Sequence, residues 1–154
     1  DAGTSTGWMI EYIREAQATY VTNALSHAKR LADKGFHVIL IGGEPKSSTD
    51  AIVGAEAVVN LQKYHFNKGF FGTNGVEQNG GFTTPDAREA MVKQTAVKNT
   101  QLANRYFLAT SSKFGEVYAV TFAGFEGGVI LTEAPVQESL PKSVRVVNVN
   151  QPEQ

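Results

Sequence analysis

The chain alternates short apolar segments with segments whose apolar residues recur at helical spacing. Residues 36–41 are β-branched and almost continuously apolar, as expected of a strand covered on both faces of a sheet. Strand-like segments that alternate with helical ones are typical of a parallel sheet with helical crossovers. We therefore predict an α/β fold, with a mostly parallel sheet covered by helices on both faces.

The same patterns give approximate positions for the elements. We expect strands at residues 20–21, 36–41, 68–72, 106–109, 118–122, 128–132 and 144–149. We expect one helix over residues 6–17 and a second between Asn23 as N-cap and Gly35 as C-terminal glycine. A third is expected from residue 51 or 53 to residue 63. A fourth is expected from Pro85-Asp86 onward, with Ala90, Met91, Val97 and Leu102 in the core. Residues 73–84 are expected to be turns, and the tail 151–154 to be frayed.

Composition narrows the class of protein. The 154 residues are the length of one domain, and we expect a single domain over residues 1–154. The net charge of −1 argues against a free-standing nucleic-acid binder, and the absence of Cys excludes disulfides and thiolate metal sites. No apolar run approaches the roughly 20 residues that span a bilayer. Because the chain begins at Asp1 and not at Met, we expect it to be part of a longer protein.

Small and polar residues follow each apolar segment, where ligands bind in open parallel sheets. Hydroxyl groups and the N–H groups at helix starts suit an anion, so this pattern favours a pocket for a small phosphorylated or carboxylated polyol. The alternative is that these residues only make turns. The segments are 1–6, 22–24, 42–44, 72–75 and 110–113. Neither the dinucleotide glycine motif nor the P-loop motif is present.

Catalytic and metal-binding patterns are weak. We expect His27 to be solvated beside basic residues, His37 to be a core histidine, and His65 to lie in a loop. No histidine spacing indicates a metal site. Glu89 and Lys93 are four apart on an expected helix, either as a surface pair or as a pocket-facing pair whose lysine meets a phosphate.

Taken in order, these segments resemble the C-terminal effector-sensing domain of DeoR-type bacterial transcriptional repressors, over nearly the whole chain. The repressors of sugar phosphotransferase operons, of the fructose and lactose types, are the most similar in character. The matching segments are 1–6, 21–24, 38–44, 53–54, 68–75, 80–85, 89–93 and 111–115.

The resemblance implies a sensor that binds a phosphorylated sugar or sugar alcohol, of the fructose 1-phosphate or tagatose 6-phosphate type, and has no cofactor, metal or membrane partner. It implies the fold shared by ribose-5-phosphate isomerase, glucosamine-6-phosphate deaminase and coenzyme A transferases. It further implies a cytoplasmic homo-oligomer that binds operator DNA only through an N-terminal winged helix-turn-helix domain, which has no counterpart in these residues.

The resemblance also implies roles for individual residues. Backbone and hydroxyl groups of the first loop would hold the phosphate, lysines would add positive charge, and Asp1 would either accept from sugar hydroxyls or orient the loop. The implied effector-binding residues are Asp1, Gly3, Thr4, Ser5, Thr6, Thr22, Asn23, Ala24, Gly42, Gly43, Glu44, Asn74, Gly75, Thr84, Lys93 and Lys113.

Two positions depart from the family pattern, because Asn74 and Thr110 stand where many members have Asp. An amide is no general base near neutral pH, so Asn74 favours sensing over turnover. Losing the acid at position 110 removes one expected partner of Lys113. A phosphosugar isomerase remains the alternative, with acidic candidates in Asp1, Glu44 and Glu89. A purely structural oligomerisation module is the third possibility.

Overall fold

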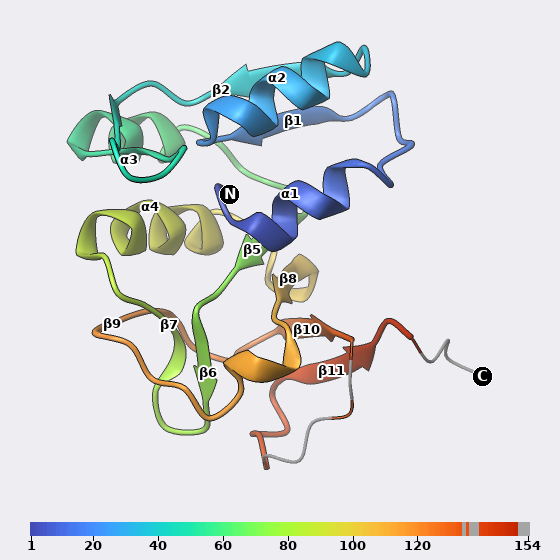
Figure 1. Ribbon diagram of the computed structural model, residues 1–154, viewed down its shortest axis with the longest axis vertical. Coiled ribbons are helices and arrows are strands. Elements are labelled where there is room, and N and C mark those ends of the chain that lie inside the picture. Colours follow the sequence, from blue (N-terminus) through green and yellow to red (C-terminus); the bar gives the residue numbers. More distant parts are fainter. Residues whose placement is uncertain (134, 136–138, 151–154) are drawn as a thin grey trace.

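Four parallel strands form one sheet in the computed structural model, which describes residues 1–133, 135 and 139–150. In spatial order they are β11 (Arg145–Asn148), β10 (Gly128–Thr132), β8 (Arg105–Leu108) and β5 (Gly69–Gly72). Helices connect and flank the strands, so the predicted α/β class is confirmed (Figure 1). The expected tail 151–154 lies outside the described residues.

A second, separate parallel sheet contains β1 (Thr19–Thr22) and β2 (His37–Leu40), joined by helix α2 (Leu25–Asp33). Helix α1 (Thr4–Ile10) and the N-terminus lie between this pair and β5 (Figure 1). The prediction that residues 36–41 are covered on both faces is wrong, because His37 and Leu40 are exposed at the two ends of β2. This strand has a hydrogen-bonded neighbour on one side, so its apolar run reflects β propensity as much as burial.

A three-stranded antiparallel sheet includes the strand expected near residues 118–122 and two strands within residues 73–84, where only turns were expected. Its strands are β6 (Gly75–Glu77), β7 (Gly81–Thr84) and β9 (Val120–Ala123), with β7 in the centre. The sequence did not indicate β6 and β7 because glycine and threonine are frequent in these strands. Their position depends on packing around the fully buried Phe82. A short antiparallel pair, β3 (Glu44–Pro45) and β4 (Ile52–Val53), completes the strands of the described residues.

Helices α3 (Ala55–Leu61) and α4 (Ala87–Lys98) pack on each other, and two 3₁₀ turns, η1 (Leu102–Asn104) and η2 (Ser111–Lys113), follow. The expected start of α4 is confirmed, since the Asp86 carboxylate accepts from the N–H groups of Arg88 and Glu89 at 2.7 and 3.2 Å. Burial of Ala90 and Val97 is confirmed as well. Met91 and Leu102 were expected in the core, but they are 57% and 54% exposed.

Two helix ends differ from the prediction. Helix α1 ends at Ile10 and not near residue 17. The Lys34 ammonium stabilises this end, because it donates to the carbonyl groups of Ile10, Glu11 and Ile13 at 2.7, 3.2 and 3.1 Å. At the start of α2, Ala24 and not Asn23 is the N-cap. Gly35, with φ +84°, follows α2 as expected of a C-terminal glycine.

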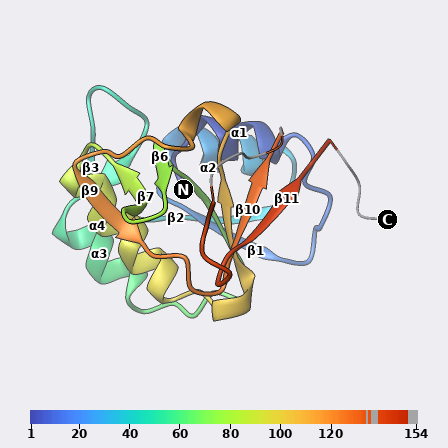
Figure 2. The ribbon, with the colours of Figure 1, turned by 90° about the horizontal axis from the view of Figure 1, so that it is seen from below.

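Four phenylalanines form the aromatic cluster, which we define as Phe82, Phe107, Phe122 and Phe125. The rings of Phe82 and Phe107 are stacked with centroids 3.8 Å apart, and this contact joins the antiparallel sheet to the four-stranded parallel sheet. A second apolar cluster lies under β4, α3 and α4. Viewed from below, α4 lies beside the antiparallel strands, with β10 and β11 on the other side of the molecule (Figure 2).

Candidate functional site

The Asp1 carboxylate joins three separate parts of the chain. Its Oδ1 accepts from the Gly3 N–H at 3.0 Å and from the Thr6 hydroxyl at 2.8 Å, while Oδ2 accepts from the Gly72 N–H at 2.8 Å. Lys93 of α4 places its Nζ 3.2 Å from Oδ2. We call these five residues the Asp1 cluster. With its side chain 6% exposed and four donors on its oxygens, Asp1 is suited to orienting the loop more than to binding sugar hydroxyls.

Lys93 is held by backbone and side-chain oxygens together. Its ammonium donates to the Gly72 carbonyl at 2.7 Å and lies 5.0 Å from the centroid of the Phe122 ring. Burial lowers the pKa of Lys93 to about 8, and Glu89 acts in the opposite direction. The Asp1 carboxylate also favours the charged form, so we expect a cation at neutral pH. Lys93 pairs with Asp1 and Glu89 pairs with Lys46, so the expected surface pair between Glu89 and Lys93 is not formed. The alternative, in which Lys93 meets a phosphate, stays a prediction.

The hydroxyl groups of the first loop differ in whether they form hydrogen bonds within the protein. Thr6 is buried, and the Asp1 carboxylate and the Gly3 carbonyl share its one hydroxyl proton, each at 2.8 Å from the Thr6 oxygen. Thr4 is exposed and Ser5 half-buried at the start of α1, and neither hydroxyl has a hydrogen-bond partner among the described residues. Thr4 and Ser5 are therefore the side chains of this loop that remain available to a ligand.

The segment from Thr22 to Ala24 is buried and has structural hydrogen bonds. The Thr22 hydroxyl accepts from the Ala24 N–H at 3.1 Å, and the Asn23 side chain donates to the Ile52 carbonyl at 3.0 Å. Asp50 caps the first turn of α2 by accepting from the Leu25 N–H and, at 2.7 Å, from the Ser26 N–H. These contacts support the turn interpretation for this segment.

Helix α2 reaches the Asp1 cluster through His27, which was not among the expected effector-binding residues. Its Nδ1 lies 2.7 Å from the Asp1 carbonyl, and because a carbonyl only accepts, Nδ1 carries the proton. Burial is the largest cause that lowers the pKa of His27 to about 4, with the amino terminus next. The ring is 7% exposed, so the expectation of a solvated His27 is wrong. The expected core histidine, His37, is exposed and hydrogen-bonds Thr19 at 3.0 Å.

The residues after β2 differ in how tightly they are packed. Gly43 has φ +146°, and a Cβ there would lie 2.7 Å from the Val53 carbonyl oxygen, so packing requires this glycine. Gly42 is exposed and faces open space. Glu44 is exposed and forms an ion pair with Arg88 of α4.

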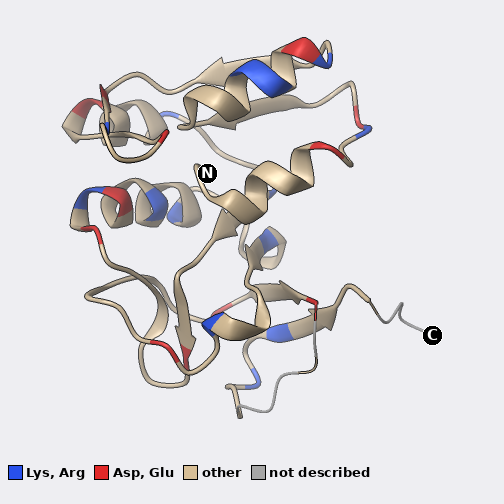
Figure 3. Ribbon diagram, viewed as in Figure 1, with Lys and Arg blue, Asp and Glu red and all other residues tan. Residues whose placement is uncertain are grey.

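Lys46 lies just beyond this segment and was missed by the sequence interpretation. Its Nζ is 2.7 Å from Asp86 and 3.5 Å from Glu89, and its side chain is 14% exposed. The hydrogen bond to Asp86 is the largest cause that raises the pKa of Lys46. Figure 3 shows both acidic and basic residues on α4, and Lys46 pairs with Glu89 of this helix and with Asp86 directly before it.

Asn74, Gly75 and Thr84, the expected opposite wall, lie together where β6 begins and β7 ends. The Thr84 hydroxyl donates to the Asn74 side-chain oxygen at 3.0 Å. Gly75 is packed tightly, since a Cβ there would lie 2.2 Å from the Glu116 carbonyl oxygen. The Asn74 amide nitrogen has no partner in the described part of the chain, so it remains a free donor.

Lys113 ends η2 and lies near β6, because the Gly115 N–H donates to the Val76 carbonyl at 2.8 Å. It has no ion pair within residues 1–133, 135 and 139–150. Glu133, which the sequence did not single out, accepts from the Ser111 N–H at 2.9 Å and from the Ser111 hydroxyl at 2.7 Å. These bonds, led by the Ser111 N–H, lower the pKa of Glu133 to about 2. A carboxylate thus already occupies the start of η2.

The expected acids are all paired. Asp1 contacts Lys93, Glu44 contacts Arg88, and Glu89 contacts Lys46. A general base needs a lone pair free to accept the substrate proton, and these pairs reduce that capacity. Within the described residues no group of three or more His, Cys, Asp or Glu side chains is arranged to hold a metal ion.

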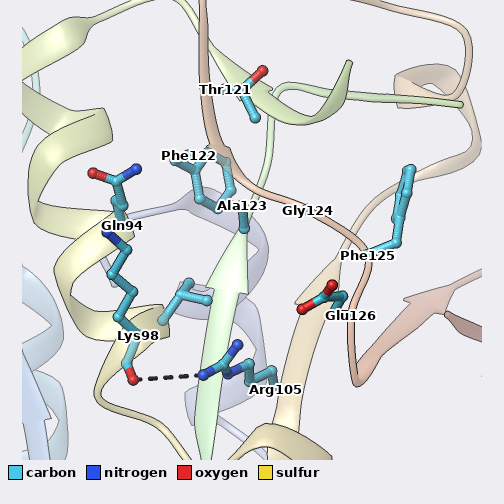
Figure 4. A pocket seen from close by; sticks show the side chains of 10 residues that line it. Gln94, Lys98, Arg105, Thr121, Phe122, Ala123, Gly124, Phe125 and Glu126 are labelled. Atoms are coloured by element: carbon cyan, nitrogen blue, oxygen red, sulfur yellow. Dashed lines mark hydrogen bonds between the residues drawn. The ribbon is translucent and has the colours of Figure 1, made fainter. Parts of the chain in front are cut away.

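A cavity of about 460 Å³ lies elsewhere, between the C-terminal half of α4 and β9 (Figure 4). It contains none of the residues expected to bind an effector. Arg105 donates to the Lys98 carbonyl at 3.5 Å at its edge. The lining residues are Gln94, Val97, Lys98, Arg105, Thr121, Phe122, Ala123, Gly124, Phe125 and Glu126.

In the described part of the chain, no helix has both the length and the apolar character needed to cross a bilayer.

The sequence is similar to one protein family and to several known proteins. Residues 1–132 match the family model described as the DeoR C terminal sensor domain. The chain is 43% identical over 133 residues to the uncharacterized HTH-type transcriptional regulator FruR of Bacillus subtilis, covering 86% of this chain and 52% of that protein. It is 30% identical to the HTH-type transcriptional regulator IolR of the same organism, over 90% of this chain and 55% of that protein.

The lactose phosphotransferase system repressor of Staphylococcus aureus is 35% identical over 117 residues, which are 74% of this chain and 45% of that protein. The chain therefore spans about half the length of these relatives. All three are transcriptional regulators or repressors by name, in agreement with the expectation of a protein that is not an enzyme.

Proposed function

Because the chain belongs to the family of DeoR C-terminal sensor domains, we propose that it binds a phosphorylated sugar and that this ligand modulates operator binding by a longer regulator. The ligand is a small ester of the fructose 1-phosphate or tagatose 6-phosphate type. The residues proposed to contact it are those of the first loop, with Gly42, Asn74 and Lys113 on the surrounding walls.

The Asp1 cluster is the observation that carries the proposal. The carboxylate fixes the first loop, the end of β5 and α4 relative to one another, while the hydroxyls of Thr4 and Ser5 in that loop have no partner among the described residues. A phosphate bound by these groups exchanges hydrogen bonds with water for charge-assisted ones. Because three segments share one carboxylate, a ligand at the loop biases the arrangement of all three, by at most its differential affinity.

The names of the relatives support the ligand class and the context. A lactose phosphotransferase system repressor is among them, and two others are HTH-type regulators. We propose that a winged helix-turn-helix domain of the longer protein binds the operator, and that the regulator acts in the cytoplasm as a homo-oligomer. The fold proposed for the complete sensor is that of ribose-5-phosphate isomerase and its relatives.

Isothermal titration calorimetry tests the proposal with fructose 1-phosphate and tagatose 6-phosphate, and with free fructose and tagatose as controls. We expect the esters to bind at least about tenfold more tightly than the free sugars, because only the esters carry the charge that the loop recognises. Equal affinity for esters and free sugars contradicts the proposal. Ketose formation from aldose phosphates would show an isomerase instead.

A pair of variants locates the site. Thr4→Ala removes one free hydroxyl and should weaken ester binding about tenfold. Ser143→Ala is the matched control, since Ser143 is exposed and precedes β11 at the amino edge of the parallel sheet. Equal ester affinity in the two variants would place the ligand away from the first loop.

A further inference from the structure

The cavity beside α4 shares no residue with the Asp1 cluster. It is bounded by the C-terminal half of α4, by Arg105 at the start of β8, and by β9 with residues 124–126 that follow it (Figure 4). Its volume of about 460 Å³ is within the range of roughly 300 to 1,000 Å³ that is usual for small-molecule pockets. A Cβ at Gly124 would meet no other atom within 4 Å, so the cavity is open beside this residue.

The inner wall of the cavity is apolar and is held by packing. Val97, Phe122 and Phe125 line it, and all three are buried in the hydrophobic core. The rings of Phe122 and Phe125 both lie against Phe82, with centroids 6.3 and 5.0 Å from its own. Because core side chains are close-packed and keep defined positions, this wall is formed before any ligand arrives. A compact apolar group, above all an aromatic ring, can pack against it.

Three charged side chains surround this wall, two of them cationic and one acidic. Arg105 is fixed at the end of α4, because its guanidinium donates to the Thr100 carbonyl at 3.1 Å and to the Lys98 carbonyl at 3.5 Å. A guanidinium has five N–H donors, so others remain for a ligand. The Lys98 ammonium and the Glu126 carboxylate are exposed and have no partner in the described part of the chain. The cavity therefore has one positive charge in excess.

This charge pattern favours a monoanion over a dianion. One excess positive charge balances a single negative charge. The carbonyl groups at the end of α4 carry partial negative charge, and together with Glu126 they disfavour a second one. Arginine binds a planar carboxylate through two parallel hydrogen bonds. A carboxylate attached to an apolar body therefore matches both the charges and the wall.

We infer that this cavity is a second ligand site, which binds a small monocarboxylate with a compact apolar body such as one aromatic ring. The carboxylate lies between Arg105 and Lys98, and the apolar body packs against Phe122 and Phe125. None of these residues belongs to the set proposed to contact the sugar ester, so the inference does not depend on the function proposed above.

Titration of the isotope-labelled chain with phenylacetate, followed by NMR, tests the inference. We expect saturable shifts at the amides of Val97, Ala123 and Gly124. Phenylacetamide is the matched control ligand, because it has the same shape without the charge, and it should bind at least about tenfold more weakly. Phenyl phosphate carries a second negative charge and should bind no more tightly than phenylacetate.

Variants test the two cations. Arg105→Gln should weaken phenylacetate binding at least about tenfold, and Lys98→Gln about fivefold. Lys63→Gln is the matched control and should leave the affinity unchanged, since Lys63 is exposed just after α3 and does not line the cavity. Arg105 also holds the end of α4, so the variant at the exposed Lys98 keeps the test decisive if Arg105→Gln does not fold.

Each of five results overturns the inference. The first is the absence of saturable shifts at the cavity amides, and the second is shifts confined to the first loop, which would place the probe at the sugar-ester site. The third is equal affinity for phenylacetate and phenylacetamide, which would exclude recognition of the carboxylate. The fourth is tighter binding of phenyl phosphate, and the fifth is an unchanged affinity in Lys98→Gln.

Discussion

The aromatic cluster and the Asp1 cluster are both buried and adjacent, yet they are held together by different forces. The aromatic cluster consists of phenylalanine rings whose contacts are non-directional. The Asp1 cluster is polar, and its bonds depend on the direction of each donor and acceptor. They meet where the Lys93 ammonium lies 5.0 Å from the Phe122 ring. The first supplies stability, while the second sets the shape of a loop.

The largest effect is expected in the aromatic cluster. Phe107→Ala should lower the free energy of unfolding by about 4 kcal/mol, because it removes a ring that stacks on Phe82 and leaves a cavity. Urea unfolding measures this. Val59→Ala is the control, since Val59 is 55% exposed and its loss should cost less than about 0.5 kcal/mol. Similar costs in both variants would show that the rings are not the main source of stability.

The next effect concerns the ion pair of the Asp1 cluster. Lys93→Met should cost about 3 kcal/mol, because the Asp1 carboxylate then loses its countercharge while its side chain stays 6% exposed. The matched control is Lys29→Met, whose pair with Asp33 is 77% and 65% exposed and should contribute less than about 1 kcal/mol. A cost for Lys93→Met no larger than that of the control would mean that the Asp1 cluster is held by its neutral hydrogen bonds alone.

A pH titration sharpens the contrast, because the aromatic cluster does not titrate. The pKa of His27 is lowered to about 4, so between about pH 6.5 and pH 4 the unfolded chain binds a proton that the folded chain does not. Stability should therefore fall as pH falls through this window, by roughly 2 to 3 kcal/mol.

Urea unfolding at a series of pH values measures this slope. His27→Gln should flatten it, whereas the exposed His37→Gln should keep the pH dependence of the wild-type chain. An unchanged slope in His27→Gln would contradict the assignment to this ring.

The smallest effect is expected at Glu133, outside both clusters. Its pKa is lowered to about 2 by the Ser111 N–H, so its contribution is present above the usual carboxyl pKa and is lost as pH falls toward 2. Because the side chain is exposed and screened, Glu133→Gln should cost less than about 1 kcal/mol. Thermal unfolding at pH 7 measures it, with the exposed Glu126→Gln as control. A loss of several kcal/mol would show that η2 is a third region of fixed structure.

Sequence patterns predicted the elements of the parallel sheet well and the histidines poorly. Strands such as β8 and β10 were found because each contains three consecutive apolar residues, 106–108 and 129–131. The environments of His27 and His37 were predicted the wrong way round, because the packing of α1 against α2 buries one ring and the open edge of β2 exposes the other. Neither fact is visible in neighbouring residues.

The candidate site was predicted by residue type and not by partner. The resemblance to DeoR-type sensors implied that Asp1, Gly3, Thr6 and Lys93 belong to one site, and the structure brings them together. The sequence did not indicate that the Thr6 hydroxyl bonds to Asp1 while the Thr4 hydroxyl has no partner among the described residues, because both are threonines of one loop. Lys46 and Glu133 were missed since their partners are tens of residues away along the chain.

The packing of Gly43 has a consequence for comparing homologues. With φ +146° and a Cβ position 2.7 Å from the Val53 carbonyl oxygen, this glycine is required by the turn whether or not a ligand ever binds there. A homologue that has lost its effector would keep it. Evolutionary loss or change of ligand preference should instead be visible at Thr4, Ser5 and Gly42, whose side-chain positions are free of such steric demands.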